Sequence, residues 1–398
     1  MANTTGTSPS PLSALVGFLY RPEVRRLVYQ ITLLALVAYA GYWVVSNVID
    51  NLRRQNIASG FEFLGRTSGF DVSQSLIAYS NASTYGRAFW VGLLNTLLVA
   101  VLGILGATVI GFIVGVARLS SNWLVAKLAA AYVEIVRNLP LLLQLFFWYY
   151  AVLKNLPGPR QSYALPGGAF LNVRGLYLPA AVPEPGFGAV LLAFAISVAA
   201  TIALLLWARR RQVVTGTRPH VLWPLLLLLS ALPLTAYLMA GQPLTLSYPE
   251  LRGFNFQGGL PVLPELIALV VGLSIYTASF IAEIVRAGIL GVPKGQTEAA
   301  EALGFTKRQT LRLVVIPLAL RIIIPPLTSQ YLNLTKNSSL AVAIGYPDFV
   351  SVFTGTVLNQ TGQAVEVIMI TMGVFLAISL ATSLFMNWFN RHVALVER

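Results

Sequence analysis

Apolar residues fall into long runs along this chain, separated by shorter segments that hold most of its charged residues. A helix that crosses the hydrocarbon core of a membrane needs about 20 mostly apolar residues. The pattern therefore predicts an all-α, polytopic membrane protein with about eight membrane-spanning helices. The predicted spans are Leu27–Ile49, Phe89–Val116, Trp123–Leu153, Val190–Trp207, Val221–Ala240, Leu263–Ile289, Leu320–Ile344 and Val365–Trp388.

The composition supports this assignment and excludes several other classes of protein. Hydrophobic residues make up 56% of the chain and charged residues only 10%, whereas soluble domains hold about 45–50% apolar and about 25% charged residues. The chain has no cysteine and two histidines, which excludes disulfides and thiolate metal sites and leaves little room for a histidine metal site or a Ser-His triad. We therefore expect this chain to bind no metal.

The distribution of basic residues predicts the sidedness of the spans. With the N-terminus inside, the cytoplasmic segments contain sixteen Lys and Arg residues and the outer segments eight, which is the direction that the positive-inside rule requires. Both termini are then cytoplasmic. Basic loops that face membrane lipid account for the net charge of +13, so the sequence predicts no nucleic-acid partner.

The segments between the spans suggest how the chain is divided. Asp50–Arg87 holds several Phe residues and is expected to pack on the outer face of the bundle. Asn155–Gly188 is rich in Pro and Gly and is interpreted as an irregular outer loop, and the helical hairpin after it as an insertion between two functional halves. The predicted parts are 1–88 with the first span and an outer loop, 89–154 as the first part of the core, 155–262 as inserted loops and hairpin, 263–389 as the second part of the core and 390–398 as a cytoplasmic tail.

A polar stretch after the sixth span predicts a helix, a turn and a second helix on the cytoplasmic face. Thr297 can cap a short helix that opens with Glu298, Gly304 can end it with a positive φ, and Thr306 begins a capping box. Pro317 is expected to interrupt the chain where it returns to the membrane. The first helix has small alanines and two acids, which favours docking into a groove of another protein over lying on lipid headgroups.

This stretch resembles the EAA loop of ABC importer permease subunits. The resemblance consists of Glu-Ala-Ala at Glu298–Ala300, then Gly304 after three residues, and Val-Val-Ile-Pro at Val314–Pro317 after nine more. Val314 stands where the family more often has Ile, and Ile316 where it more often has Leu. Both changes are conservative.

Further segments resemble the polar amino-acid branch of that family; they are Glu283–Gly288, Pro293–Gln296 and Lys336–Leu340. Asn337 and Ser338 stand where the branch usually has Asp and Thr. The resemblance covers Phe89–Leu153 and Leu263–Trp388, and the N-terminal part and the central insertion look most like the Q-type permease of general L-amino acid importers.

The resemblance implies a type I importer permease core in a bacterial inner membrane. It implies a subunit of an ATP-driven, binding-protein-dependent L-amino acid importer that forms half of the translocation path. The implied partners are a periplasmic amino-acid-binding protein, a second homologous permease, and an ABC ATPase dimer that binds ATP and Mg and contacts the loop 293–317. The residues expected to couple this chain to the ATPase are Gln296, Glu298, Ala299, Ala300, Ala302 and Gly304. The sequence has no GxxxxGK[ST] motif, so ATP hydrolysis is expected of a partner and not of this chain.

Two charged residues deep in the third span are candidates for the substrate path. Glu134 and Arg137 lie one helical turn apart, and ionised groups at that depth are costly unless they are paired or hydrated. They either pair with each other and hold the helix against its neighbour, or match the ammonium and carboxylate of an amino acid. Pro140 follows one turn later and can free a backbone carbonyl toward the path.

Lys336 is a single charge deep in the seventh span, and Asn337 and Ser338 follow it in a polar run. A lysine extends only about one helical turn toward water, so this run predicts a water-lined path. The alternative is a lysine that bridges the backbone carbonyls of a broken helix. Glu283 and Arg286, near the cytoplasmic end of the sixth span, are interpreted as interfacial structure or gate contacts.

An ion-coupled secondary amino-acid transporter is the alternative function. It requires an ionisable relay or a cation site at a broken helix within the membrane. The predicted spans hold few acids, and the most specific motif is cytoplasmic, which favours the importer subunit.

Overall fold

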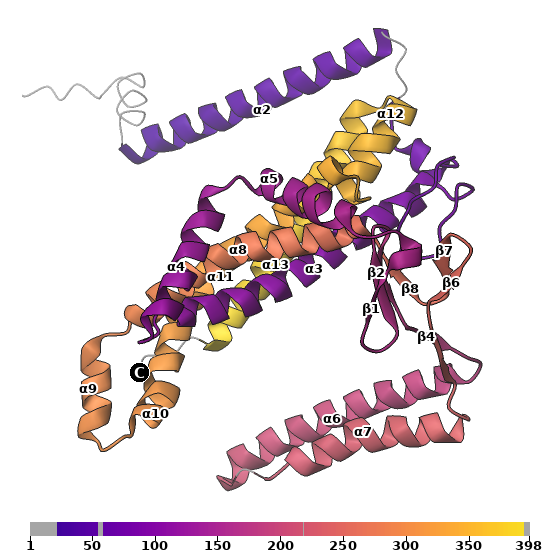
Figure 1. Cartoon of the computed structure of the whole chain (residues 1–398). Helices are drawn as coiled ribbons and strands as arrows, with labels where there is room; N and C mark the ends of the chain where they lie inside the picture. The colour runs from indigo at the N-terminus through magenta and orange to yellow at the C-terminus, as the bar shows by residue number, and fades with distance from the viewer. Residues whose placement is uncertain (1–21, 55–58, 218, 394–398) are drawn as a thin grey trace, which may run out of the picture.

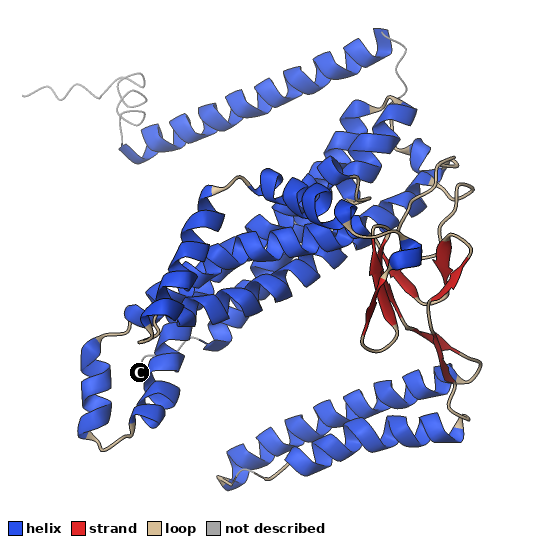
Figure 2. Cartoon of the chain, in the orientation of Figure 1, coloured by secondary structure: helices blue, strands red, loops and turns tan. Residues whose placement is uncertain are grey.

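The computed structural model describes residues 22–54, 59–217 and 219–393, and this part of the chain is mostly helical (Figure 2). Seven of its helices are long and apolar enough to cross a membrane, and a bent pair makes an eighth if it counts as one span, which confirms the expectation of about eight. The long helices are α2 (Pro22–Arg54), α3 (Tyr85–Ala117), α6 (Phe187–Thr215), α7 (Leu222–Met239), α8 (Pro264–Leu290), α11 (Ile316–Asn337) and α13 (Ala364–Val393). Shorter helical elements are η1 (Glu62–Gly65), η4 (Pro159–Gln161), α9 (Lys294–Ala302), α10 (Lys307–Thr310), η5 (Leu311–Val315), η6 (Ser338–Ile344), η7 (Ser351–Val357) and α12 (Leu358–Thr361).

The third predicted span is not one continuous helix. It consists of α4 (Trp123–Asn138), α5 (Leu141–Phe146), η2 (Phe147–Val152) and η3 (Leu153–Asn155). The axis turns by 106° after α4, where Leu139 and Pro140 have ψ values of 131° and 133°. Proline has no N–H to donate and disfavours helical backbone in the residue before it. The sequence predicted one span over Trp123–Leu153, and the structure shows that it is broken at Leu139 and Pro140.

The contact between α3 and α8 forms the centre of the bundle. Gly111 and Gly115 of α3 lie directly against Ile281 and Val285 of α8. A Cβ atom on Gly111 would lie 2.6 Å from the Cβ atom of Ile281, and one on Gly115 would lie 2.7 Å from that of Val285. Because glycine has no side chain, the two backbones can approach this closely.

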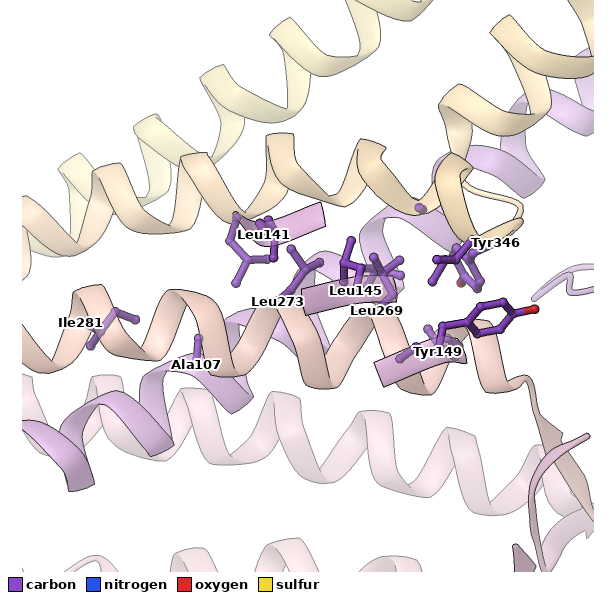
Figure 3. Packing of buried hydrophobic residues seen from close by; sticks show 14 of the residues in the cluster. Ala107, Leu141, Leu145, Tyr149, Leu269, Leu273, Ile281 and Tyr346 are labelled. Carbon is purple, nitrogen blue, oxygen red and sulfur yellow. The ribbon is translucent and has the colours of Figure 1, made fainter. Parts of the chain in front are cut away.

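The bent segment packs into the same core. Its side chains Leu141, Leu145 and Tyr149 lie among Leu269 and Leu273 of α8 (Figure 3). All five are buried. The segment after the break is thus anchored by apolar contacts, which fixes the direction in which the chain leaves α4.

The long outer segment before α3 packs on the bundle, as the sequence predicted. Phe63 of η1 is 2% exposed and belongs to a second apolar cluster with Tyr85, Phe349 and Phe353. The rings of Phe349 and Phe353 stack at 4.7 Å between centroids. This cluster joins the outer segment to the start of α3 and to η7.

The segments around the hairpin are not irregular, and that expectation was wrong. They form eight short strands: β1 (Tyr163–Leu165), β2 (Ala169–Asn172), β3 (Gly175–Leu178), β4 (Ala180–Pro183), β5 (Leu244–Ser247), β6 (Glu250–Arg252), β7 (Asn255–Gln257) and β8 (Leu260–Val262). One sheet has the order β1-β2-β3-β8, and β4 pairs with β5 and β6 with β7, all antiparallel. Because β3 precedes the helical hairpin and β8 follows it, their pairing brings together the chain segments before and after the hairpin.

The hairpin of α6 and α7 lies apart from the bundle (Figure 1). The two helices pack extensively on each other, and no comparable contact joins either of them to another helix in the described part of the chain. The pairing of β4 with β5 connects the hairpin to the rest of the molecule.

Candidate coupling loop and substrate path

The predicted helix-turn-helix is formed by α9, a turn at Gly304 and α10, and it projects from one end of the bundle (Figure 1). α9 begins at Lys294, four residues earlier than the predicted start at Glu298, and the N–H of Gln296 already donates to the carbonyl of Pro293 at 3.0 Å. Thr297 therefore lies within the helix, and the prediction that it caps the helix was wrong. Proline is well suited to the position before a helix, since it needs no N–H partner there.

Gly304 ends α9 as expected. Its φ is +81°, and its N–H donates to the carbonyl of Glu301 while that of Phe305 donates to the carbonyl of Ala300. These two bonds make a Schellman motif, in which glycine adopts left-handed backbone at no steric cost. The turn orients α9 relative to α10.

The predicted coupling residues lie on this projecting element, but not all on the same face. Ala300 is only 4% exposed and packs inward. Gln296, Glu298, Ala299, Ala302 and Gly304 are exposed. The exposed side of α9 therefore carries small side chains and the carboxylates of Glu298 and Glu301, with Leu303 beside them at 77% exposure.

The second helix continues into the membrane without the predicted interruption. The side chain of Thr306 and Gln309 form the expected capping box. The chain from Lys307 to Ile344 counts as one candidate span, and Pro317 lies in the first turn of α11, directly after the π turn η5. A π turn accommodates a local mismatch in the hydrogen-bond ladder, which explains why Pro317 does not break the helix.

A charged network lies where the bundle meets this loop. Glu283 of α8 pairs with Arg118, at the end of α3, and with Arg286 at 2.6 Å. The network joins α3 and α8 one to two turns before α8 ends at Leu290. The interpretation of Glu283 and Arg286 as interfacial structure agrees with these contacts.

Glu134 and Arg137 are both exposed on α4, and they do not pair with each other among the ion pairs of the described residues. The guanidinium of Arg137 lies 4.9 Å from the ring centroid of Phe280 of α8. The idea that the two charges neutralise each other was therefore wrong. Arg137 occupies the last turn of α4, about 21 Å along the helix from Trp123, where the helix dipole favours a cation.

The break after α4 has its own hydrogen bonds, which sequence reasoning missed. The side-chain amide of Gln144 donates to the carbonyls of Val136 and Leu139, at 2.9 and 3.0 Å. These carbonyls are ones that Pro140 and the end of α4 leave without helical partners. The predicted free carbonyl is thus partly satisfied from within the chain. A Gln four residues after a Pro in an apolar run is the signal that could have indicated this.

Lys336 is exposed near the end of α11 and lies in a shallow groove of about 460 Å³ with Ser339, Val350, Phe375 and Ser379. No hydrogen bond joins its ammonium to a backbone carbonyl in the described part of the chain, so the bridging alternative was wrong. No ion pair or hydrogen bond connects the Lys336 groove with Glu134 or Arg137 among the described residues.

The residues after Lys336 differ in their surroundings. Ser338 is fully buried, and its hydroxyl donates to the carbonyl of Thr335 at 2.7 Å. Asn337 is half-buried. Asn337 is therefore better placed than Ser338 to face a path.

A buried carboxylate that the sequence analysis did not single out lies between η6 and η7. Asp348 is 0% exposed; its Oδ1 accepts the N–H of Ser351 at 2.8 Å, and its Oδ2 has no hydrogen-bond partner. Burial raises the pKa of Asp348 to about 7, because desolvation disfavours the charged form. The amide of Asn95 holds the same turn by donating to the carbonyls of Gln74 and Pro347 at 2.9 Å.

A second missed cluster joins the outer end of the bent segment to α8. The hydroxyl of Tyr149 donates to Glu265 at 2.5 Å, and the ammonium of Lys154 lies 3.8 Å from the same carboxylate oxygen. Lys154 also lies 4.9 Å from the ring centroid of Tyr149. Glu265 lies more than 100 positions after Tyr149 and Lys154, so no local pattern indicates the cluster.

The sequence matches the family described as binding-protein-dependent transport system inner membrane component over residues 107–395. The general L-amino acid transport system permease protein AapQ of Rhizobium johnstonii is 54% identical over 380 residues, which cover 96% of this chain and 95% of that protein. The putative amino-acid ABC transporter permease protein YhdX of Escherichia coli is 54% identical over 95% of this chain and 96% of that protein. The glutamate/glutamine/aspartate/asparagine transport system permease protein BztB of Rhodobacter capsulatus is 41% identical, with 96% of each chain covered.

These matches confirm the family resemblance inferred from the segment Glu298–Pro317. The family match covers well over half of the chain, and the three relatives align along almost their whole length. The chain belongs to the family of inner membrane components of binding-protein-dependent transport systems.

Proposed function

We propose that this chain is a permease subunit of an ATP-driven, binding-protein-dependent importer of L-amino acids. Its relatives are permeases whose names specify amino-acid transport. The observation that carries the proposal is the projecting α9, whose exposed side presents Glu298, Ala299 and Ala302 before the turn at Gly304. Small side chains allow a partner's groove to approach the helix closely. The partner that fits is a cytoplasmic ATPase dimer, which binds ATP and Mg.

The membrane path is proposed to include Glu134 and Arg137. Both are exposed in this single chain and are not paired with each other. Charged side chains at membrane depth need water, a counter-charge or a partner. A second homologous permease facing α4 would supply the other half of the path, and an amino-acid zwitterion would match the two charges. Lys336 and Asn337 are proposed as a further part of the path.

The test is uptake of radiolabelled L-amino acids by proteoliposomes that contain this chain, its copurified membrane partners and the binding protein. Glu298→Lys reverses the carboxylate on the exposed side of α9 and is expected to lower ATP-dependent uptake at least tenfold, since a charge-assisted contact contributes about 1.5–3 kcal/mol. Glu23→Lys is the matched control, because Glu23 is an exposed acid in the first turn of α2, outside the loop.

Equal loss in both variants would show that charge alone matters and would remove the coupling role of α9. Uptake by the purified chain without ATP or partners would overturn the importer proposal and favour an ion-coupled transporter. Copurification of an ATPase with a phosphate-binding loop and of a second permease is the expected result of mass spectrometry on the tagged complex.

A further inference from the structure

The helical hairpin presents most of its surface outward. α6 and α7 contact mainly each other, and apolar side chains along both helices are exposed, among them Leu192 at 63% and Leu227 at 66%. Since both helices are long and apolar enough to cross a membrane, these faces meet lipid. The hairpin therefore contacts the bilayer over far more of its surface than α8 does, which is largely buried in the bundle.

A run of unneutralised positive charge lies at one end of the hairpin. Arg209, Arg210 and Arg211 follow one another in the last two turns of α6, and all three are exposed. The sequence has no Asp or Glu between Glu184 and Glu250, and none of the three arginines takes part in an ion pair in the described part of the chain. Guanidinium groups match the geometry of phosphate oxygens and form paired, charge-assisted hydrogen bonds with them.

Two tryptophans place this charge at the level of lipid headgroups. Trp207 is 49% exposed, and the guanidinium of Arg211 lies 5.2 Å from its ring centroid. Trp223, in the first turn of α7, is 77% exposed. Tryptophan is enriched where the hydrocarbon core meets the headgroups. The arginines just beyond Trp207 in α6 therefore lie where phosphates are found.

An apolar groove begins at the same level. A shallow depression of about 740 Å³ follows α7 from Trp223 past Leu227 and Ser230 to Leu234. The eleven helical steps from Trp223 to Leu234 span about 16 Å. The hydroxyl of Ser230 donates to the carbonyl of Leu226 at 2.7 Å, so the groove offers an acyl chain an almost wholly apolar wall.

We propose that this end of the hairpin binds an anionic phospholipid, with its phosphate on Arg209–Arg211 and an acyl chain along the groove of α7. Three positive charges without a carboxylate nearby favour a lipid of net negative charge over a zwitterionic one, whose own cation would be repelled. The bound lipid would hold the basic end of the hairpin at the membrane surface. This inference depends on the hairpin lying in a membrane and not on the identity of the transported solute.

The test is native mass spectrometry of the detergent-purified full chain titrated with phosphatidylglycerol or phosphatidylcholine. The wild type is expected to bind phosphatidylglycerol about tenfold to a hundredfold more tightly, given the attraction of clustered basic residues to anionic lipid. The variant with Arg209→Gln, Arg210→Gln and Arg211→Gln is expected to bind the two lipids within about twofold of each other. These side chains are exposed, so its unfolding temperature in detergent should be unchanged.

The matched control removes three exposed arginines elsewhere, by Arg66→Gln, Arg160→Gln and Arg174→Gln, and is expected to keep the preference. Ser230→Trp fills the groove without a change of charge and is expected to weaken binding of long-chain phosphatidylglycerol severalfold while a short-chain form binds as before. Inorganic phosphate at equal concentration should not displace the lipid. The proposal is overturned if the wild type shows no preference, if both triple variants lose it equally, or if phosphate displaces the lipid.

Discussion

The close contact of α3 with α8 predicts that adding a single methyl group will destabilise the bundle. In Gly111→Ala, the new Cβ atom would lie 2.6 Å from both Cβ and Cγ2 of Ile281 and 3.1 Å from the carbonyl oxygen of Ala278. Carbon atoms in contact are about 3.5–4.0 Å apart. Because the Cβ atom of Ile281 and the carbonyl are fixed by the backbone, no rotamer change relieves the overlap, and the helices must separate by roughly 1 Å.

The magnitude follows from two opposing effects. Overpacking a close contact destabilises the fold by about 1–3 kcal/mol, while replacing glycine by alanine within a helix stabilises the helix by up to about 1 kcal/mol. The net loss corresponds to a fall in unfolding temperature of several degrees, at about 2–4 °C per kcal/mol for domains of this order of size. Gly115→Ala should behave in the same way, since its Cβ atom would lie 2.7 Å from the Cβ atom of Val285 and 2.8 Å from the carbonyl oxygen of Ala282.

The assay is thermal unfolding of the purified chain in detergent, followed by tryptophan fluorescence. Gly373→Ala is the matched control, because Gly373 lies within α13 with no atom within 4 Å of an added Cβ, and it should leave the unfolding temperature unchanged or raise it slightly. If Gly111→Ala and Gly373→Ala had the same effect, the helices would not be in the contact described, and the reasoning would be refuted.

Three further predictions concern the bent segment, the outer turn and the path. Gln144→Leu should destabilise the chain by about 1–3 kcal/mol in the same unfolding assay, since it leaves two carbonyls at the break unpaired. Asn155→Leu removes a similar pair of hydrogen bonds at an exposed site and should destabilise the chain much less. Equal destabilisation by the two variants would argue against a special role of the break. Burial raises the pKa of Asp348 to about 7 in the folded chain, against about 3.9 when unfolded, so the folded state binds more protons between these values. The free energy of unfolding should therefore fall by about 1.4 kcal/mol per pH unit as the pH rises from 4 to 7. Asp348→Asn should make the unfolding temperature depend less on pH between pH 5 and pH 8, and an unchanged pH dependence would contradict this. Arg137→Ala should lower amino-acid uptake at least tenfold with assembly intact, whereas Arg160→Ala, which removes a comparable stacked arginine on the outer segment, should not; unchanged uptake would remove Arg137 from the path.

The spans could be predicted from sequence because a run of about 20 apolar residues has few alternatives to crossing a membrane. The break at Pro140 could not, since proline within a membrane helix is often tolerated when other groups satisfy the freed backbone. Here Gln144 satisfies it after the chain has turned, and the sequence does not distinguish a kink from a turn of 106°.

The outer sheet was missed for a different reason. Its strands are three or four residues long, and β3 pairs with β8 by joining Leu176 to Val262 across the whole hairpin. Such pairings produce no local periodicity, and Pro and Gly in the segment favour turns. The helix-turn-helix of the candidate coupling loop could be predicted because its glycine turn and capping box are local. The start of α9 was misplaced because Pro293 and Thr297 are both able to precede a helix.

Departures from regular helix occur where the charged residues of the proposed path and coupling loop lie. Arg137 stands in the last turn of α4 before the break, Lys336 is one residue before the end of α11, and the π turn η5 lies near the end of the candidate coupling loop. A continuous apolar helix satisfies its own backbone and offers a solute no polar group, whereas a break exposes carbonyls and redirects side chains toward water. The α3–α8 contact, in contrast, is buried and lined by glycines. It follows that substitutions at the breaks should change transport more than assembly, and substitutions at the α3–α8 contact should change assembly more than transport.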